Sequence, residues 1–272
     1  MLTTGQLEAV ARDGYVVLPG FFRAGAMAAA RAAVNRVFAP AYADWRSAGG
    51  RNALPHPRRL FPWGEAAIDR LAVDERLRAI AEQVVGTRRL LLCEAHLGAK
   101  YPGCAGDPPH TDHHGNSLGP EPADPREMLR TPVFFVYLTD VGPDEAPIMM
   151  IPHGAPDGEA RAITGAAGTV TLYTQQTRHH GTPFLAAVGQ RLVMWVALQD
   201  AGEPFALPRL FTIKSGREQS PSGDYEARMA RFMADATHRD LELLGFPPAD
   251  DPWWTPRRRD GMRRRWPGFA AV

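Results

Sequence analysis

The sequence has few of the features that mark several large classes of protein. Its charge is almost balanced, with 31 Lys and Arg against 30 Asp and Glu in 272 residues. This composition lacks the basic character of a general nucleic-acid-binding protein. The apolar runs are shorter than the roughly 20 residues that cross a bilayer, and no basic segment precedes an apolar one at the N-terminus. We therefore expect a cytoplasmic protein with no nucleic-acid or membrane partner.

Cysteine is scarce as well. Cys93 and Cys104 are the two cysteines, so the chain cannot build a disulfide framework, and neither lies in a CxxC zinc motif. We expect both to be structural thiols in a reducing compartment. Glycine and proline are common, with 26 and 25 residues, but they are scattered rather than gathered in one tract. Scattered turn residues favour a fold of many short strands.

The N-terminal part of the sequence is mostly helical in pattern. Thr3 or Thr4 can cap a helix that stops at Asp13-Gly14, and the apolar run 15–18 predicts a strand. Helical spacing predicts two further helices, and the segment between them is typical of a loop. These helices are expected at 26–38 and 73–85, with the loop at 40–63.

The middle of the sequence changes to short apolar or β-branched runs separated by turns, as in a jelly roll or barrel. The expected strands lie at 90–97, 133–138, 148–151, 169–173, 192–198 and 210–213. A helical pattern returns at 226–244. The remaining tail is rich in Pro and Arg, and we expect it to be irregular, with its arginines solvated or paired with acidic residues of 235–251.

No linker divides the chain. We therefore expect one domain over residues 1–272 that is mainly β, with flanking helices. Its β core should cover about 88–215, after a helical N-terminal part and before the C-terminal helix and tail.

One segment of the sequence has the spacing of a metal site. His110 and Asp112 stand two residues apart, and residues i and i+2 of a strand point to the same side. Two imidazoles and one carboxylate on one face of the metal are the ligand set of non-haem Fe(II) oxygenases. Asp112 and His114 have the same spacing, and an H-x-D pair on a strand is often only an exposed polar pair.

A second histidine must come from elsewhere in the chain. Downstream of the strand pattern 168–173 stand the neighbouring His179 and His180, and Arg191 begins the next apolar strand. Spacing alone does not choose between these two histidines. Arg191 could bind an anion, although a buried arginine usually pairs with a carboxylate inside the protein.

With these segments in order, the sequence resembles the phytanoyl-CoA dioxygenase family of Fe(II)/2-oxoglutarate oxygenases over roughly residues 5–215. The opening Asp13-Gly-Tyr-Val-Val-Leu-Pro-Gly-Phe-Phe, the His110-Thr-Asp112 motif and the distal His179-His-Gly-Thr-Pro segment carry the resemblance. Arg191, twelve residues further on, corresponds to the co-substrate arginine. The turn at Pro152-His153-Gly154 departs from the family's Pro-Gly-Ser-His turn.

The resemblance implies a double-stranded β-helix, related to the cupins, in which His110, Asp112 and His179 bind Fe(II). It also implies that Arg191 binds the C5 carboxylate of 2-oxoglutarate through its planar fork. Four further residues are candidates on position alone. Phe135 could form an apolar wall beside the co-substrate or simply belong to the core, and substrate contacts are considered for Lys100, Tyr101 and His113. A solvated lysine and surface histidines at 113 and 114 are the alternatives.

The implied activity is oxidation of a small organic substrate with 2-oxoglutarate and O2, most simply hydroxylation of an unactivated C–H bond with release of succinate and CO2. Asp112 favours oxygenation over halogenation, since in related halogenases a small residue replaces the carboxylate. Desaturation, cyclisation and epimerisation begin in the same way. Two alternatives are a non-catalytic metal-binding β-helix protein and a cupin-like metalloenzyme that does not use 2-oxoglutarate.

Overall fold

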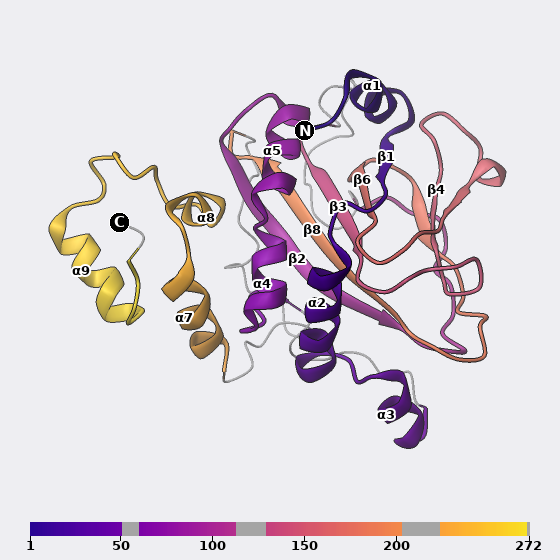
Figure 1. Ribbon diagram of the computed structural model, residues 1–272. Coiled ribbons are helices and arrows are strands. Elements are labelled where there is room, and N and C mark those ends of the chain that lie inside the picture. Colours follow the sequence, from indigo (N-terminus) through magenta and orange to yellow (C-terminus); the bar gives the residue numbers. More distant parts are fainter. Residues whose placement is uncertain (51–59, 113–128, 203–223, 271–272) are drawn as a thin grey trace.

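The computed structural model describes residues 1–50, 60–112, 129–202 and 224–270 (Figure 1). Its helices are α1 (Thr4–Asp13), α2 (Ala24–Val37), α3 (Tyr42–Ser47), α4 (Ala66–Ala72), α5 (Glu75–Val85), α7 (Tyr225–Asp235), α8 (His238–Leu243) and α9 (Pro256–Arg265). Its strands are β1 (Tyr15–Leu18), β2 (Leu90–Lys100), β3 (Pro132–Tyr137), β4 (Ile148–Met150), β5 (Arg161–Ile163), β6 (Val170–Thr174), β7 (His179–Gly181) and β8 (Arg191–Asp200). Within these described stretches, no helix combines the length and apolar character needed to cross a membrane.

The strands form two antiparallel sheets. The larger has five strands in the order β1-β6-β3-β8-β2, and the smaller has three in the order β5-β4-β7. Helices lie along one side of the larger sheet, and the smaller sheet lies on the other side (Figure 1). The larger sheet is therefore covered on both faces.

The covering of both faces explains why the central strands are almost continuously apolar. Along β3, Phe134 and Val136 pack into the cluster that the helices share, whereas Phe135 and Tyr137 pack into the cluster between the two sheets. Strand β8 divides its side chains in the same way. A period of two thus separates the two apolar layers even where no polar residue interrupts the sequence.

The helical layer is built from both ends of the chain. Ala30 and Ala33 of α2 are completely buried, and their small side chains let the helix lie close to its neighbours. From the C-terminal end, Phe232 of α7 and Leu241 of α8 enter the same apolar cluster. Residues that are remote in sequence therefore share one core.

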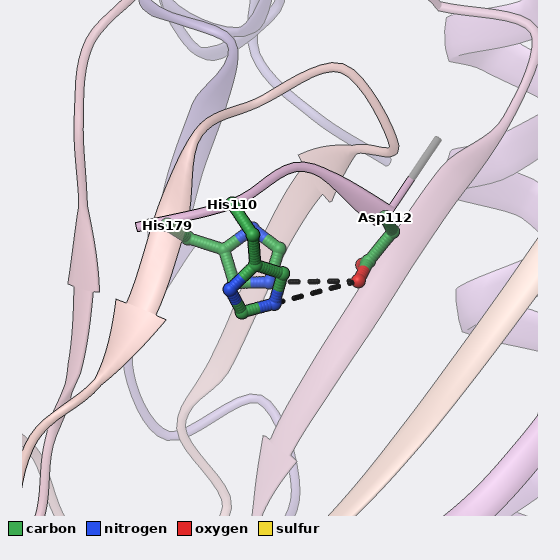
Figure 2. Close-up of side chains that lie close together, drawn as sticks. All are labelled: His110, Asp112 and His179. Atoms are coloured by element: carbon green, nitrogen blue, oxygen red, sulfur yellow. Dashed lines mark ion pairs between the residues drawn. The ribbon is translucent and has the colours of Figure 1, made fainter. Parts of the chain in front are cut away.

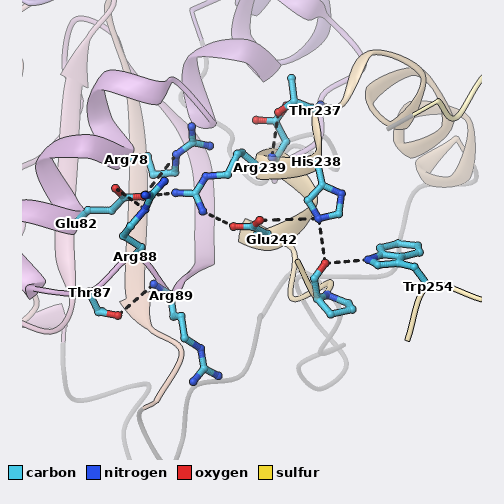
Figure 3. A network of polar contacts seen from close by, with 12 residues as sticks. Arg78, Glu82, Thr87, Arg88, Arg89, Thr237, His238, Arg239, Glu242 and Trp254 are labelled. Atoms are coloured by element: carbon cyan, nitrogen blue, oxygen red, sulfur yellow. Dashed lines mark hydrogen bonds and ion pairs between the residues drawn. The ribbon is translucent and has the colours of Figure 1, made fainter. Parts of the chain in front are cut away.

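Polar contacts attach the C-terminal helices to α5 (Figure 3). Arg239 of α8 is ion-paired with Glu82 of α5 and with Glu242 of its own helix. Beyond α8, the indole nitrogen of Trp254 donates to the carbonyl oxygen of Pro247 at 3.0 Å. The Arg239–Glu82 pair therefore holds α8 against α5, and the Trp254 contact holds the segment after α8 within the C-terminal region.

The expected strands at 90–97, 133–138, 148–151, 169–173 and 192–198 are all present, with bounds shifted by at most three residues. The expected strand at 210–213 lies outside the described residues. The expectation of a mainly β chain is met only in part, because helical residues outnumber strand residues among those described. Short helices that the sequence did not predict, such as α3 and α4, account for much of the additional helix. Six or seven residues are too few to show a clear helical period.

The expectation of an irregular tail was wrong. The segment forms α9, which begins where the Thr255 side chain caps the helix and Pro256 occupies its first turn. Two of its arginines pair with Glu226 and Asp260, both outside the acidic region expected to receive them. A Thr-Pro helix start was visible in the sequence, but the charge-rich, weakly periodic residues after it concealed the helix.

One prediction concerns the junction between α1 and β1. Gly14 ends α1 with a φ of 83°, and a Cβ there would lie 2.3 Å from the Nε2 atom of His153. We expect Gly14→Ala to lower the free energy of unfolding by about 1–3 kcal/mol, because it adds left-handed backbone strain and a clash. Urea unfolding measures the difference.

The matched control is Gly5→Ala in the same helix. A Cβ added at Gly5 would meet no other part of the protein within 4 Å, so alanine extends into open space. We expect this variant to be as stable as the parent or more stable by up to about 1 kcal/mol. Equal losses in both variants would contradict the explanation.

Candidate metal centre

Main-chain pairing brings the two histidine segments together. His110 and His179 exchange two backbone hydrogen bonds, each 2.9 Å from nitrogen to oxygen. The amide of Asp107 donates to the carbonyl of Gly181 at 2.8 Å. The segment before the H-x-D motif therefore lies beside β7 as a short antiparallel neighbour.

This pairing places His110, Asp112 and His179 side by side (Figure 2). The Oδ1 atom of Asp112 is 3.7 Å from Nε2 of His179 and 4.0 Å from Nε2 of His110. The candidate ligand atoms of all three residues lie within 4.8 Å of one another. Ligands held about 2.1 Å from a common ion are separated by about 3–4 Å, so small adjustments allow the three to share one ion.

The two imidazoles are oriented by the main chain. Nδ1 of His179 lies 2.9 Å from the carbonyl oxygen of Thr177, and Nδ1 of His110 lies 2.9 Å from that of Pro108. Because a carbonyl can only accept, each Nδ1 donates, and in a neutral imidazole this leaves the lone pair on Nε2. Burial lowers the pKa of His179, which favours the neutral form that binds metals.

The structure also separates His179 from its neighbour. Successive side chains of a strand point to opposite faces, so His180 on β7 faces away from the side on which His179 meets His110 and Asp112. His113 and His114 lie outside the described residues.

Two residues that the sequence did not single out lie beside the carboxylate: Tyr173 contacts it, and Trp195 contacts Tyr173. The hydroxyl of Tyr173 donates to Oδ2 of Asp112 at 3.0 Å, and the indole nitrogen of Trp195 donates to the Tyr173 oxygen at 2.6 Å. Burial, and to a smaller extent the nearby Asp112, raises the pKa of Tyr173 well above its ordinary value. Tyr173 therefore remains a protonated donor.

Arg191 begins β8 and is buried. Its Nη1 atom donates to the carbonyl oxygen of Ala146, its Nε atom is buried without a partner, and its guanidinium carbon lies 5.7 Å from the centre of the Phe135 ring. Across the part of the chain that the structure describes, no Asp or Glu forms an ion pair with it, and burial lowers its pKa. An arginine so placed still carries its charge and can receive an anion.

Lys100 and Tyr101 have other partners. The Lys100 ammonium donates to the carbonyl oxygens of Ala105 and Thr182, and to Oδ2 of Asp107, at 3.0–3.2 Å. With 12% of its side chain exposed, it is not the solvated lysine considered above.

Tyr101 faces the helical layer. It stacks on Trp45 at 4.6 Å between ring centres and donates to the carbonyl of Pro40 at 2.6 Å. Burial raises its pKa to about 12. Its contacts do not support a substrate role.

The fold is that of known non-heme enzymes. The chain is similar to the alpha-ketoglutarate (2-oxoglutarate)-dependent epimerase SnoN from nogalamycin biosynthesis, with 21% identity over 81% of this chain and 95% of that chain and a TM-score of 0.57. It is similar to iron-bound HygX from Streptomyces hygroscopicus, with 19% identity, coverage of 76% and 90%, and a TM-score of 0.57. It is also similar to EctD from S. alaskensis, solved with 2-oxoglutarate and 5-hydroxyectoine, with 23% identity, coverage of 79% and 82%, and a TM-score of 0.60. At these identities the likeness establishes the fold.

Among curated proteins, none matches the sequence significantly. The family profile described as phytanoyl-CoA dioxygenase (PhyH) matches residues 10–161, which is more than half of the chain. The chain therefore belongs to the phytanoyl-CoA dioxygenase family, as the resemblance of its motifs predicted. The match includes His110 and Asp112 but ends before His179 and Arg191, whose placement rests on the geometry above.

Proposed function

We propose that the protein is an Fe(II)- and 2-oxoglutarate-dependent dioxygenase that hydroxylates an unactivated C–H bond of a small organic metabolite. In this proposal residues 1–272 form one catalytic domain, and the two sheets are the halves of a double-stranded β-helix. The observation that carries the proposal is the convergence of His110, Asp112 and His179 from segments that are remote in sequence.

The donor set fits ferrous iron. Two neutral imidazoles and one carboxylate give the site a charge of −1 before the metal binds, and His110, Asp112 and His179 would hold a ferrous ion there. When bound, iron with 2-oxoglutarate and O2 supplies the oxidising chemistry, and succinate and CO2 are the co-products. The protein's part is to hold the three ligands and to bind and orient the organic molecules.

Arg191 and Phe135 fit the co-substrate. The buried guanidinium offers an unused donor, and a carboxylate such as C5 of 2-oxoglutarate would supply the missing acceptor and the counter-charge. Phe135 presents its ring on the same inter-sheet face and supplies an apolar wall. We propose no substrate contact for Tyr101.

A small-molecule substrate is supported by what the similar structures contain. SnoN was solved with alpha-ketoglutarate and nogalamycin RO, and EctD with 5-hydroxyectoine. The named activities of such structures include an epimerase and a carbocyclase. Epimerisation, ring closure and desaturation therefore belong with hydroxylation in the range of proposed outcomes.

The test is an anaerobic titration followed by an aerobic screen. Metal-free protein is titrated with Fe(II) and 2-oxoglutarate, and small metabolites are then screened for those that increase succinate release. We expect 2-oxoglutarate to bind far more tightly when Fe(II) is present, and succinate release to require Fe(II), 2-oxoglutarate and O2 together.

The two alternatives give different results in this test. A non-catalytic metal-binding protein would bind Fe(II) and release no succinate with any metabolite. A cupin-like enzyme of another chemistry would turn over its substrate without 2-oxoglutarate.

A further inference from the structure

Tyr173 lies at the centre of the candidate metal site without belonging to the metal-binding set. It is 1% exposed on β6, between β1 and β3. Its ring centre lies 4.8 Å from that of His179, and its hydroxyl contacts Oδ2 of Asp112. One side chain therefore touches two of the three candidate ligands.

The direction of the Tyr173 hydroxyl proton follows from its two partners. An indole N–H can only donate, so the 2.6 Å contact from Trp195 requires the Tyr173 oxygen to accept. The single hydroxyl proton is then left for the carboxylate of Asp112. Trp195 thus fixes the direction in which Tyr173 donates.

Trp195 is itself held by the strands on either side. On β8 it stands opposite Phe135 of β3 and His96 of β2. The His96 ring stacks on the indole at 4.6 Å with an angle of 17° between the planes, and Nδ1 of His96 lies 3.2 Å from Glu94. The rigid centre of the larger sheet therefore determines where the Tyr173 hydroxyl points.

The contact distinguishes the two oxygens of Asp112. Oδ2 accepts the hydrogen bond from the Tyr173 hydroxyl, whereas Oδ1 is the oxygen nearest to both imidazole Nε2 atoms. We propose that Tyr173, directed by Trp195, is a positioning residue that makes Asp112 a one-oxygen ligand of the iron through Oδ1. A carboxylate that bound through both oxygens would occupy a coordination position that the co-substrate needs. This inference rests on the proposed function.

The test compares Tyr173→Phe with Tyr15→Phe. Tyr15 is a matched control, because it is buried in the same inter-sheet cluster and stands directly opposite Tyr173 on β1, but contacts none of the three ligands. Metal-free proteins are titrated with Mn(II) and Co(II), which require no turnover. We expect Tyr173→Phe to raise the metal Kd about 10- to 100-fold, the usual effect of losing a group that orients a ligand, and Tyr15→Phe to stay within twofold of wild type.

The visible spectrum of bound Co(II) gives a second reading, because it reports the number and geometry of the ligands. A merely structural tyrosine would leave it unchanged. We expect the Tyr15→Phe spectrum to match the wild type and the Tyr173→Phe spectrum to differ. A Tyr173→Phe protein with wild-type Kd and spectrum would overturn the inference.

Trp195→Phe keeps the Tyr173 hydroxyl but removes the donor that directs it. We expect a smaller rise in Kd, about 3- to 10-fold, within the range for loss of one neutral hydrogen bond. If Tyr173→Phe does not fold, Trp195→Phe tests the inference by itself. An unchanged metal Kd in Trp195→Phe would then overturn the inference. Absence of metal binding by the wild type would instead reject the proposed function, so the two failures are distinguishable.

Discussion

Replacing Asp112 with alanine is expected to abolish iron-dependent turnover. The change removes the sole anionic member of the candidate set and leaves two neutral imidazoles. It also removes the acceptor of the buried Tyr173 hydroxyl. Since loss of a group that merely orients a ligand typically costs about 10- to 100-fold in metal affinity, we expect the Fe(II) Kd to rise by more than about 100-fold. Anaerobic Fe(II) titration and the rate of succinate release measure the two effects.

Asp107→Asn is the matched control for this change. Asp107 lies on the same segment beside β7, but its side chain is 57% exposed and pairs with Lys100. The Asp107 carboxylate is directed at Lys100 and is not one of the three candidate ligands, so we expect metal affinity within about twofold of wild type. Wild-type iron affinity and turnover in Asp112→Ala would show that the ligand set is wrong.

The part of this site that lies within one short stretch of sequence could be predicted. His110 and Asp112 are two residues apart, and strand geometry predicted that they share a side. The structure does bring them together, although only His110 forms a β-bridge and Asp112 lies outside every strand. The choice of His179 over His180 is different, because it depends on which face of β7 meets His110. That face is set by the two backbone hydrogen bonds between His110 and His179, a pairing that no local pattern encodes.

Tyr173 and Trp195 could not be predicted for the same reason. Each belongs to an apolar strand that reads as core, and their contact exists because β6 and β8 flank β3 in the sheet. The order of strands in an antiparallel sheet is a non-local property.

At the end of β2, by contrast, the alternation of side chains along a strand was enough to separate Lys100 from Tyr101. It directs Lys100 toward Asp107 and Tyr101 toward the helices.

Replacing Arg191 with methionine is expected to remove 2-oxoglutarate binding while leaving Fe(II) binding intact. Methionine keeps most of the side-chain length but has no guanidinium fork. Truncating one partner of a buried hydrogen-bonded charge pair costs about 2–5 kcal/mol, so the Kd for 2-oxoglutarate should rise by about 30-fold to several thousand-fold. The Kd of Arg191→Lys for 2-oxoglutarate should lie between those of the wild type and Arg191→Met, because lysine keeps the charge but loses the two-point geometry. Anaerobic titrations of the metal-loaded proteins with 2-oxoglutarate measure the series.

The effect of Arg191→Met on stability separates a binding arginine from an ordinary core arginine. Arg228 of α7 is equally buried, but it pairs with Asp224 and donates to the carbonyl of Pro62. Arg228→Met should therefore lower the thermal midpoint without changing 2-oxoglutarate affinity.

Arg191 has a buried nitrogen with no partner and no acidic partner among the described residues. A buried charge without a counter-charge is costly in the free protein, so Arg191→Met should unfold at the same temperature as the wild type or higher. A midpoint lowered as in Arg228→Met, with unchanged 2-oxoglutarate affinity, would identify Arg191 as part of the core and favour an enzyme that does not use this co-substrate.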